Sequence, residues 1–194
     1  MDKNVLYPGS KIWDLYYRDV DDNGVIDNRD MVMTDKTNIP ATTFGANISL
    51  NYRDFGLWVN FAGATNYWQY YHVNARTAIN QLEDVIVNRY TPGSMDSKYP
   101  RLPTLETQVD VSGLNSNFWM RDASYVKLKT LEFSYTLPES FLSKINIEYV
   151  KVYLNGNNLL TFDKLKWNDP ENSSNTNGNY PQQKVFNLGL NLTF

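Results

Sequence analysis

The residues with the clearest chemistry in this sequence stand close together near its start, in the segment 19–30. Hard cations such as Ca²⁺ need several oxygen ligands from one tight loop, and an EF-hand loop provides them from positions 1, 3, 5, 7, 9 and 12 around a glycine at position 6. Counted from the first aspartate, these positions hold oxygen-bearing groups: Asp19, Asp21, Asn23, the main-chain carbonyl of Val25, Asp27 and Asp30, with Gly24 sixth. Ile26, the eighth residue, is apolar and can pack inward. The spacing predicts a structural site for Ca²⁺ or a similar cation.

Two features of this segment leave a second interpretation open. Asp30 stands where EF-hand loops carry a glutamate, and its shorter side chain reaches a bound ion less readily with both oxygens. No helices are predicted on either side of the segment, so a cation would clamp the loop and would not make it a sensor. The alternative is a polar turn in which Asp and Asn side chains bond to their own backbone.

Other residue types give little support for catalysis. His72 is the only histidine, which is too few for a zinc site and leaves any Ser/His/Asp triad without identifiable partners. The sequence has no cysteine, which excludes thiolate metal sites and cysteine nucleophiles. Acidic neighbours such as Glu83 with Asp84, or Asp169 with Glu171, have the groups for glycoside hydrolysis, but we interpret them as solvated charge. We therefore expect no enzymatic activity.

A short aromatic run provides weak candidates for substrate contact. The candidates are Tyr67, Trp68, Tyr70 and Tyr71. Such rings can stack on sugars, but tyrosine and tryptophan also gather where a barrel crosses the bilayer interface. The substrate-binding residues therefore stay unknown at this point.

The composition narrows the class of protein. A net charge of −3 without a basic cluster gives no electrostatic footprint for nucleic acid, so we expect no nucleic-acid partner. No apolar run of about 18 residues is present, which excludes a transmembrane helix. The aromatic content of 14 % stands beside a mean hydropathy of −0.50. Membrane β-barrels produce this combination, because every second residue faces a polar lumen.

Alternating apolar and polar residues indicate the strands that would position these groups. The clearest case is the last segment, in which one parity is apolar: Phe186, Leu188, Leu190, Leu192 and Phe194. The other parity is mostly small or polar, which suits a wet lumen better than a protein core. Six strands are predicted, at 11–18, 43–52, 55–64, 124–136, 147–160 and 184–194.

The connections between these strands alternate in length, as they do in outer-membrane barrels. Short turns are predicted at 53–54 and 137–146, and long loops at 19–42, 65–123 and 161–183. We expect the long loops to be extracellular and to carry function. Apolar residues at helical spacing predict one short helix at 76–89. By parity, Lys127 and Lys129 share the apolar face of their strand, near its extracellular end.

Seven segments resemble the C-terminal part of SusC/RagA TonB-linked outer-membrane proteins, in the same order and over nearly the whole chain. They are Asp19–Asp27, Asn88–Pro92, Tyr99–Leu102, Asn117–Lys129, Tyr135–Pro138, Val152–Phe162 and Asn187–Phe194. The resemblance implies an all-β fold of antiparallel transmembrane strands with one short helix in a long extracellular loop. Residues 1–194 would be the C-terminal portion of a receptor barrel, with about six strands and without the plug domain and the N-terminal strands.

The same resemblance implies a function in the cell outer membrane. It implies a TonB-dependent importer of oligosaccharides or peptides that works with a SusD-like lipoprotein, and contact with the TonB complex through the missing N-terminal part. Phe194 resembles the aromatic end of the signal that the barrel-assembly machinery reads. Apart from structural Ca²⁺, no cofactor is implied.

Two other classes stay open from the residues alone. The first is a soluble or secreted all-β carbohydrate-binding module with a calcium-clamped loop, which would bury the face that we assign to lipid. The second is a calcium-stabilised glycosidase fragment, which needs two carboxylates in one cleft.

Overall fold

The computed structural model describes residues 4–5, 10, 13–70, 83–94, 96–101, 116–165, 169–172 and 182–194. The chain divides into two compact units. The loop unit comprises Met1–Lys36, Tyr70–Met120 and Ser174–Asn179, and the sheet unit comprises Thr37–Gln69, Arg121–Ser173 and Tyr180–Phe194. No helix in the described part of the chain has the length and apolar character of a membrane-spanning helix.

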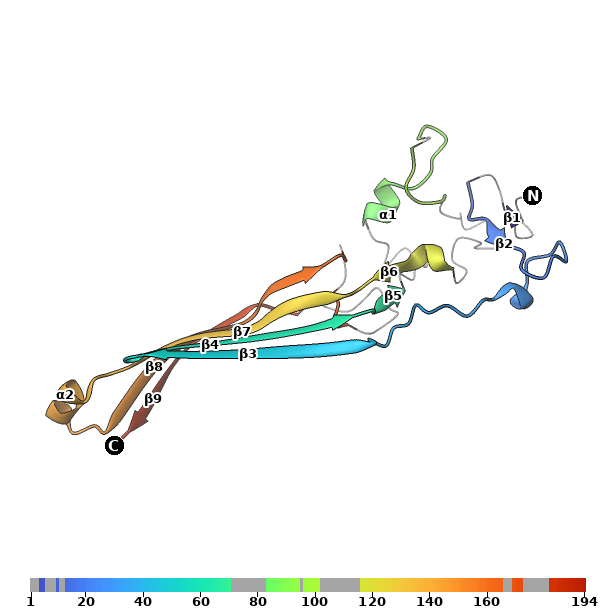
Figure 1. Cartoon of the computed structure of the whole chain (residues 1–194). Coiled ribbons are helices and arrows are strands. Elements are labelled where there is room, and N and C mark those ends of the chain that lie inside the picture. The colour runs from blue at the N-terminus through green and yellow to red at the C-terminus, as the bar shows by residue number, and fades with distance from the viewer. Residues whose placement is uncertain are drawn as a thin grey trace. The chain divides into compact units, whose positions relative to one another are not determined.

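The sheet unit is built on five antiparallel strands (Figure 1). In spatial order they are β3 (Thr42–Tyr52), β4 (Phe55–Thr65), β7 (Tyr125–Thr136), β8 (Tyr149–Asp163) and β9 (Val185–Thr193). These strands confirm five of the six predicted ones, with β8 extending furthest beyond its predicted end. Period-2 alternation was a reliable signal here because each strand has one apolar and one polar face.

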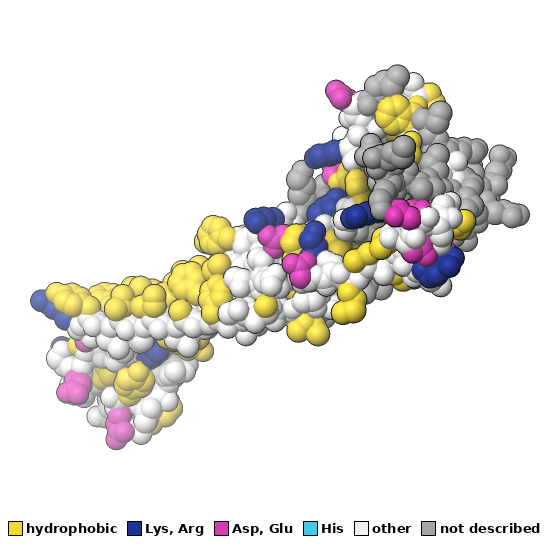
Figure 2. All heavy atoms as spheres, turned by 45° about the vertical axis from the view of Figure 1, so that its right-hand side comes forward, with side chains coloured by type: hydrophobic (Ala, Val, Ile, Leu, Met, Phe, Trp, Pro, Cys, Tyr) yellow, Lys and Arg dark blue, Asp and Glu magenta, His cyan; other side chains and the backbone are white. Residues whose placement is uncertain are grey.

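One face of this sheet is apolar and exposed. Partners across an antiparallel ladder lie on the same face, so the register sorts the side chains. Cross-strand pairs on this face are Ile48 with Val59, Leu57 with Phe133, Phe133 with Leu154 and Leu154 with Leu188. Leu188 is 77 % exposed and Leu190 55 % exposed. In Figure 2 hydrophobic side chains form a yellow band along the sheet, beside a band that is mostly white.

The opposite face is polar and is held together by side-chain hydrogen bonds between neighbouring strands. Asn60 donates to Asn47 at 2.6 Å, and Asn187 donates to Asn155 at 2.9 Å. Lys151 lies 3.2 Å from Glu132 in an ion pair on the same face. The predicted separation of Asn187, on the polar face, from its apolar neighbours in β9 is therefore confirmed.

A β-bulge in β7 corrects the predicted position of Lys127. Thr130 pairs with Asn60, but the next ladder partner, Phe61, pairs with Leu128, so Lys129 is an extra residue. An extra residue reverses the parity of the strand beyond it. Lys127 therefore lies on the polar face and not, as parity alone predicted, with the apolar side chains.

The connections of the sheet unit differ in structure. Arg53, at φ +52°, allows the tight turn between β3 and β4. The connection between β7 and β8 contains a short helix, α2 (Glu139–Leu142), followed by the 3₁₀ turn η4 (Ser143–Ile145). Alternation does not predict these elements. Leu142 is buried and Asn146, in the left-handed region, ends the turn.

The loop unit has little regular structure. Its elements are β1 (Asn4–Val5), β2 (Tyr17–Arg18), η1 (Asn28–Asp30), α1 (Glu83–Val87) and η3 (Asn117–Trp119). β1 and β2 pair antiparallel. The predicted strand 11–18 is wrong over most of its described length, because Trp13 has φ +75° and only Tyr17–Arg18 are extended in a ladder.

The predicted helix 76–89 is confirmed over α1 (Glu83–Val87), but it ends two residues earlier than predicted, because Arg89 forms an isolated β-bridge with Tyr99. Residues 71–82 lie outside the described part. The side chain of Asn88 donates to the Asp84 carbonyl at 3.0 Å and bonds one of the last helical acceptors. Val85 is buried at 2 % exposure and Trp119 stacks on Tyr99 with ring centres 6.0 Å apart. The Tyr99 hydroxyl donates to Asp84 at 2.7 Å, which ties this aromatic pair to α1.

The remaining strands are short. β5 (Trp68–Tyr70) and β6 (Met120–Asp122) pair as a two-stranded sheet that alternation did not predict. Each has three residues, which is too few to show a period.

Candidate functional site

The segment Asp19–Asp30 folds into a loop stabilised by its own side chains. Asp19 accepts from the Gly24 amide at 2.7 Å and from the Asn23 amide at 3.2 Å. Gly24 takes φ +81°, a conformation that glycine adopts without cost. Asp30 accepts from the Val20 amide at 2.7 Å, which closes the loop across ten residues. Ile26 is 8 % exposed, so its predicted inward packing is confirmed.

Three of the six predicted ligands come together in this loop. Carboxylate oxygens of Asp19, Asp21 and Asp30 all lie within 4.8 Å of one another. Asn23 instead accepts from the Val25 amide at 2.7 Å, as in a polar turn. This arrangement has features of both a cation site and a polar turn, because the carboxylates that accept from backbone amides belong to the same residues that would bind a cation.

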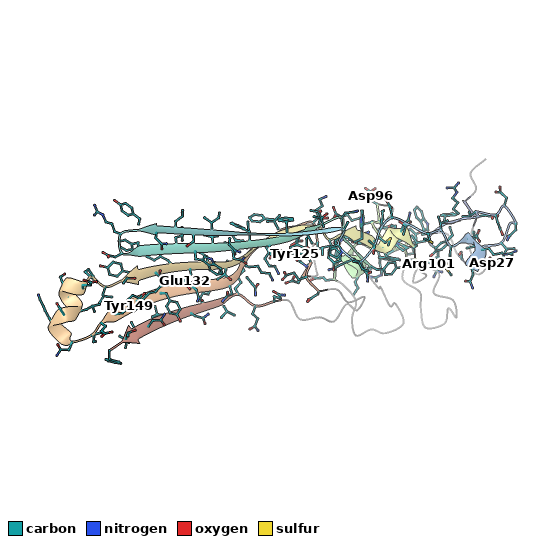
Figure 3. All side chains as sticks on the ribbon, turned by 60° about the horizontal axis from the view of Figure 1, so that its bottom comes forward. Asp27, Asp96, Arg101, Tyr125, Glu132 and Tyr149 are labelled. Carbon is teal, nitrogen blue, oxygen red and sulfur yellow. The ribbon has the colours of Figure 1, made fainter. Side chains whose placement is uncertain are left out.

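Arg29 places a positively charged guanidinium in this loop, at a position that EF-hand spacing does not assign to a ligand. Its guanidinium pairs with Asp27 at 2.7 Å and lies 3.6 Å from Asp21. The side-chain hydrogen bond from Arg29 lowers the pKa of Asp27. Hydrogen bonds from the Val20 and Asp27 amides lower the pKa of Asp30. These carboxylates are therefore ionised at neutral pH, and Asp27 is directed to Arg29 (Asp27 is labelled in Figure 3).

The aromatic candidates for substrate contact do not form one exposed surface. Tyr67 is 3 % exposed, and its hydroxyl accepts from Gln69 at 3.1 Å. Trp68 and Tyr70 are half-buried, and the Tyr70 hydroxyl accepts from the Ser116 amide at 3.0 Å. Tyr71 lies outside the described residues. Tyr67 thus serves packing, and sequence alone could not distinguish this from ligand contact.

A pocket of the loop unit holds other aromatic residues. Its volume is about 370 Å³, and Trp13 stacks on Tyr90 at its wall with ring centres 4.4 Å apart. The buried Asp14 pairs with Arg101 at 2.7 Å beside them. Trp13 was predicted as a strand residue, and no periodic signal marks the pocket.

The sheet unit contains a buried ionic cluster, which we call the Lys127 cluster. It consists of Lys127, Lys129, Asp169, Glu171, Tyr125 and Gln69. The Lys127 side chain is 1 % exposed and its ammonium lies 3.1 Å from Asp169 and 2.9 Å from Glu171. Lys129 contacts Glu171 at 2.6 Å. The interpretation of Asp169 and Glu171 as solvated charge is wrong, since their side chains are 9 % and 14 % exposed.

The charged state of the carboxylates in this cluster depends on the lysines that pair with them. Burial raises the pKa of Glu171, but the hydrogen bonds from Lys129 and Lys127 outweigh it and hold the pKa below its ordinary value. Removal of one partner from a buried ion pair typically costs about 3–5 kcal/mol, because the other charge is left without compensation. The carboxylates of Asp169 and Glu171 are therefore structural groups in ion pairs.

Phe194 follows β9 directly and is 82 % exposed. It has the parity of Leu190 and Leu192, which belong to the apolar face.

Comparison with known sequences gives two relatives in Formosa agariphila. The chain is 33 % identical over 204 residues to TonB-dependent receptor P3, and the match covers 96 % of the chain and 19 % of the receptor. It is 27 % identical to TonB-dependent receptor P26, with 92 % of the chain and 19 % of that receptor covered. The chain thus spans about a fifth of the length of these relatives. No family model matches the chain.

Comparison with solved structures gives the RagAB peptide importer. Its open-open state matches with a TM-score of 0.73 and 24 % identity, over 99 % of this chain and 22 % of the other, a likeness of fold. A structure of the RagAB peptide transporter matches with a TM-score of 0.67 and 26 % identity, over 89 % of this chain and 19 % of the other.

Proposed function

The chain belongs to the SusC/RagA-like TonB-dependent receptors of the outer membrane, and on this premise we propose that it forms part of the barrel wall of a nutrient importer. The proposed role is transport and not catalysis. Its proposed substrates are oligosaccharides or peptides, and RagAB, a solved structure with a similar fold, is named as a peptide importer.

The observation that carries this proposal is the division of the sheet into two unlike faces. A face made mainly of Phe, Leu, Ile and Val side chains stands opposite a mostly polar face, which carries asparagine in β3, β4, β8 and β9 and Thr, Ser, Glu and Lys in β7. A membrane barrel needs this division, because one face meets lipid and the other a wet lumen. A soluble carbohydrate-binding module would instead bury the apolar face, whereas Leu188 is 77 % exposed.

The import role is tested in cells that express the complete receptor. Uptake of labelled peptides and of labelled oligosaccharides is measured with and without the receptor, and again after energy coupling through TonB is abolished. Uptake of either series that depends on both the receptor and TonB supports the proposal. Equal uptake by cells without the receptor would refute it.

The proposed partners follow from the same family. They are a SusD-like lipoprotein over the extracellular side, the TonB complex through another part of the receptor, and the barrel-assembly machinery acting on Phe194. Co-purification of a lipoprotein with the receptor in mild detergent tests the first of these. A receptor that is isolated alone under conditions that preserve other membrane complexes would speak against it.

The segment Asp19–Asp30 has a second proposed role, as a cation-clamped extracellular loop. Support comes from the carboxylates of Asp19, Asp21 and Asp30, whose oxygens lie within 4.8 Å of one another. Like charges at this separation repel unless a cation or hydrogen-bond donors compensate them. Ca²⁺ suits such an oxygen set, and the ligand positions of Asn23, Val25 and Asp27 would complete it after Asp27 turns away from Arg29.

A further inference from the structure

The turn Asp169–Asn172 is tied to the sheet unit by three sets of bonds. The first is the pair of carboxylates that Asp169 and Glu171 direct at Lys127. The second is Gln69, whose side-chain amide donates to the main-chain carbonyls of three residues of the turn at 2.8–3.3 Å. The third is the Gln182 amide, which donates to Asp169 at 3.4 Å. Bonds from three separate segments hold one short turn.

Gln69 is matched to this turn in detail. Its side chain is buried, and the two N–H groups of its amide are shared among the buried carbonyl of Pro170 and the partly buried carbonyls of Asp169 and Asn172. Among the described residues its amide oxygen has no hydrogen-bond partner, so the hydrogen bonds of this side chain that the structure describes are all made by the NH₂ group. A glutamate of the same shape would place a carboxylate against these carbonyls.

The turn lies over the polar face of the sheet. Lys127 pairs in the ladder with Ala62, which has the parity of Asn60 and therefore shares its polar face. Tyr125 has the parity of Lys127, and its hydroxyl bonds to Glu171 at 3.2 Å. Figure 3 labels Tyr125 near the start of β7 and Glu132 further along the same strand. The turn is thus fixed at the end of β7 that meets the long connections.

In a membrane barrel the polar face borders the lumen, and a turn fixed against it takes up part of the passage. Resting on the proposed import function, we propose that Asp169–Asn172 is a fixed constriction at the outer end of the lumen, held in place by the Lys127 cluster, which limits the size of imported molecules. Lys127 and Gln69 are positioning residues in this arrangement, because they act through the turn.

The position of the turn is tested with a buried thiol in the complete receptor. Pro170 is buried, and residues 1–194 contain no cysteine. Pro170→Cys should react slowly with a water-soluble maleimide, with labelling followed by mass spectrometry of the peptide that contains the turn. Addition of Lys127→Met should raise the labelling rate by about tenfold or more, because the buried Asp169 loses its ion-pair partner and Glu171 keeps only Lys129 of its two. Gln69→Glu should raise it in the same direction.

The matched control is Lys164→Met. Lys164 also pairs with an acid, Asp122 at 2.7 Å, but its side chain is 75 % exposed. An exposed pair contributes little, so this variant should leave the labelling rate within about twofold of the parent. Should Lys127→Met prevent folding, the triple change Lys127→Met, Asp169→Asn and Glu171→Gln removes the uncompensated charges and keeps the measurement possible. Unchanged labelling in Gln69→Glu and in the folded lysine variant would overturn the proposal.

The size limit is tested by uptake of short and long members of one labelled series, in peptides and in oligosaccharides. Release of the turn should raise uptake of long members relative to short ones at least severalfold, while Lys164→Met should not. A released turn with an unchanged ratio would overturn the constriction. Absence of uptake of both series by the unmodified receptor would refute the import function instead, and the thiol measurement would still report on the turn.

Discussion

Leu188→Arg is expected to destabilise the receptor in its membrane far more than a neighbouring change to the same residue. Leu188 is the fourth of nine residues of β9, so it stands near the middle of a strand of membrane-spanning length. It lies on the apolar face opposite Leu154 and is 77 % exposed to the surroundings of that face. An arginine directed to lipid near the bilayer centre costs about 2–4 kcal/mol.

The matched variant is Asn187→Arg, one residue earlier in β9. Asn187 lies on the polar face and donates to Asn155 at 2.9 Å. The loss of one such hydrogen bond costs about 0.5–1.5 kcal/mol, and an arginine on a wet lumen wall has no desolvation cost to add. The two variants should therefore differ by roughly 0.5–3.5 kcal/mol, with Leu188→Arg the less stable.

The measurement is the free energy of unfolding of the complete receptor in lipid vesicles, from urea titrations of both variants and the parent. If the chain formed a soluble β-sandwich that buried Leu188, Leu188→Arg would also be more destabilising than Asn187→Arg. The titration is therefore repeated in vesicles whose lipids have shorter acyl chains. A thinner bilayer should reduce the penalty at Leu188 only if that residue faces lipid. Equal destabilisation in both variants, or a penalty independent of bilayer thickness, would refute the assignment of the faces.

Three further outcomes follow from individual residues. Gly63→Ala should lower the free energy of unfolding by about 1–3 kcal/mol, because a Cβ there would meet the Phe44 ring and lie 2.6 Å from the Tyr125 carbonyl. Gly45→Ala, whose Cβ would have its nearest contact at 3.5 Å, should lower it much less. Urea titration of the two variants measures the difference. Deletion of Phe194 should reduce the amount of assembled receptor in the outer membrane without reducing its synthesis, and normal surface levels would contradict the role in assembly. Asp21→Ala should abolish Ca²⁺-dependent protection of the loop 19–30 from proteolysis, whereas Asp22→Asn, which retains a side chain suited to φ +59°, should preserve it; equal behaviour of the two would leave a polar turn.

The strands of the sheet could be predicted from the sequence because their physical cause is local. In β9, Leu188 and Leu190 alternate with Asn187 and Gly189, and neither partner strand is needed to recognise the pattern. The predicted strand 11–18 is wrong because the alternation of apolar and polar residues does not report the backbone conformation at Trp13. Trp13 adopts φ +75°, which a bulky residue takes only when its surroundings determine it.

The functional groups were harder to predict because their partners are distant in sequence. Lys127 and Asp169 are 42 residues apart and meet only after β7, β8 and the turn have formed. The bulge at Lys129 is also absent from any periodic pattern, since one extra residue changes the parity without changing the types of residue. In contrast, Asp19 and Gly24 are five residues apart, and their contact follows from the local spacing. Arg29 could have been noticed as a competitor for Asp27, two residues away.

The bulge in β7 also bears on how this strand tolerates insertions and deletions in its gene. Loss of the codon for Lys129 would remove the extra residue, and Lys127 would stay opposite Ala62 on the polar face in an unbroken ladder with β4. A strand that kept Lys129 but lost the bulge would instead carry Lys127 to the side of Leu131 and Phe133, which would exchange a lumen cation for a lipid-facing one. Substitutions at Lys129 leave the number of residues, and therefore the parity, unchanged. Related genes should therefore either keep the bulge or lack one residue at this position, and in both cases the cation should face the lumen.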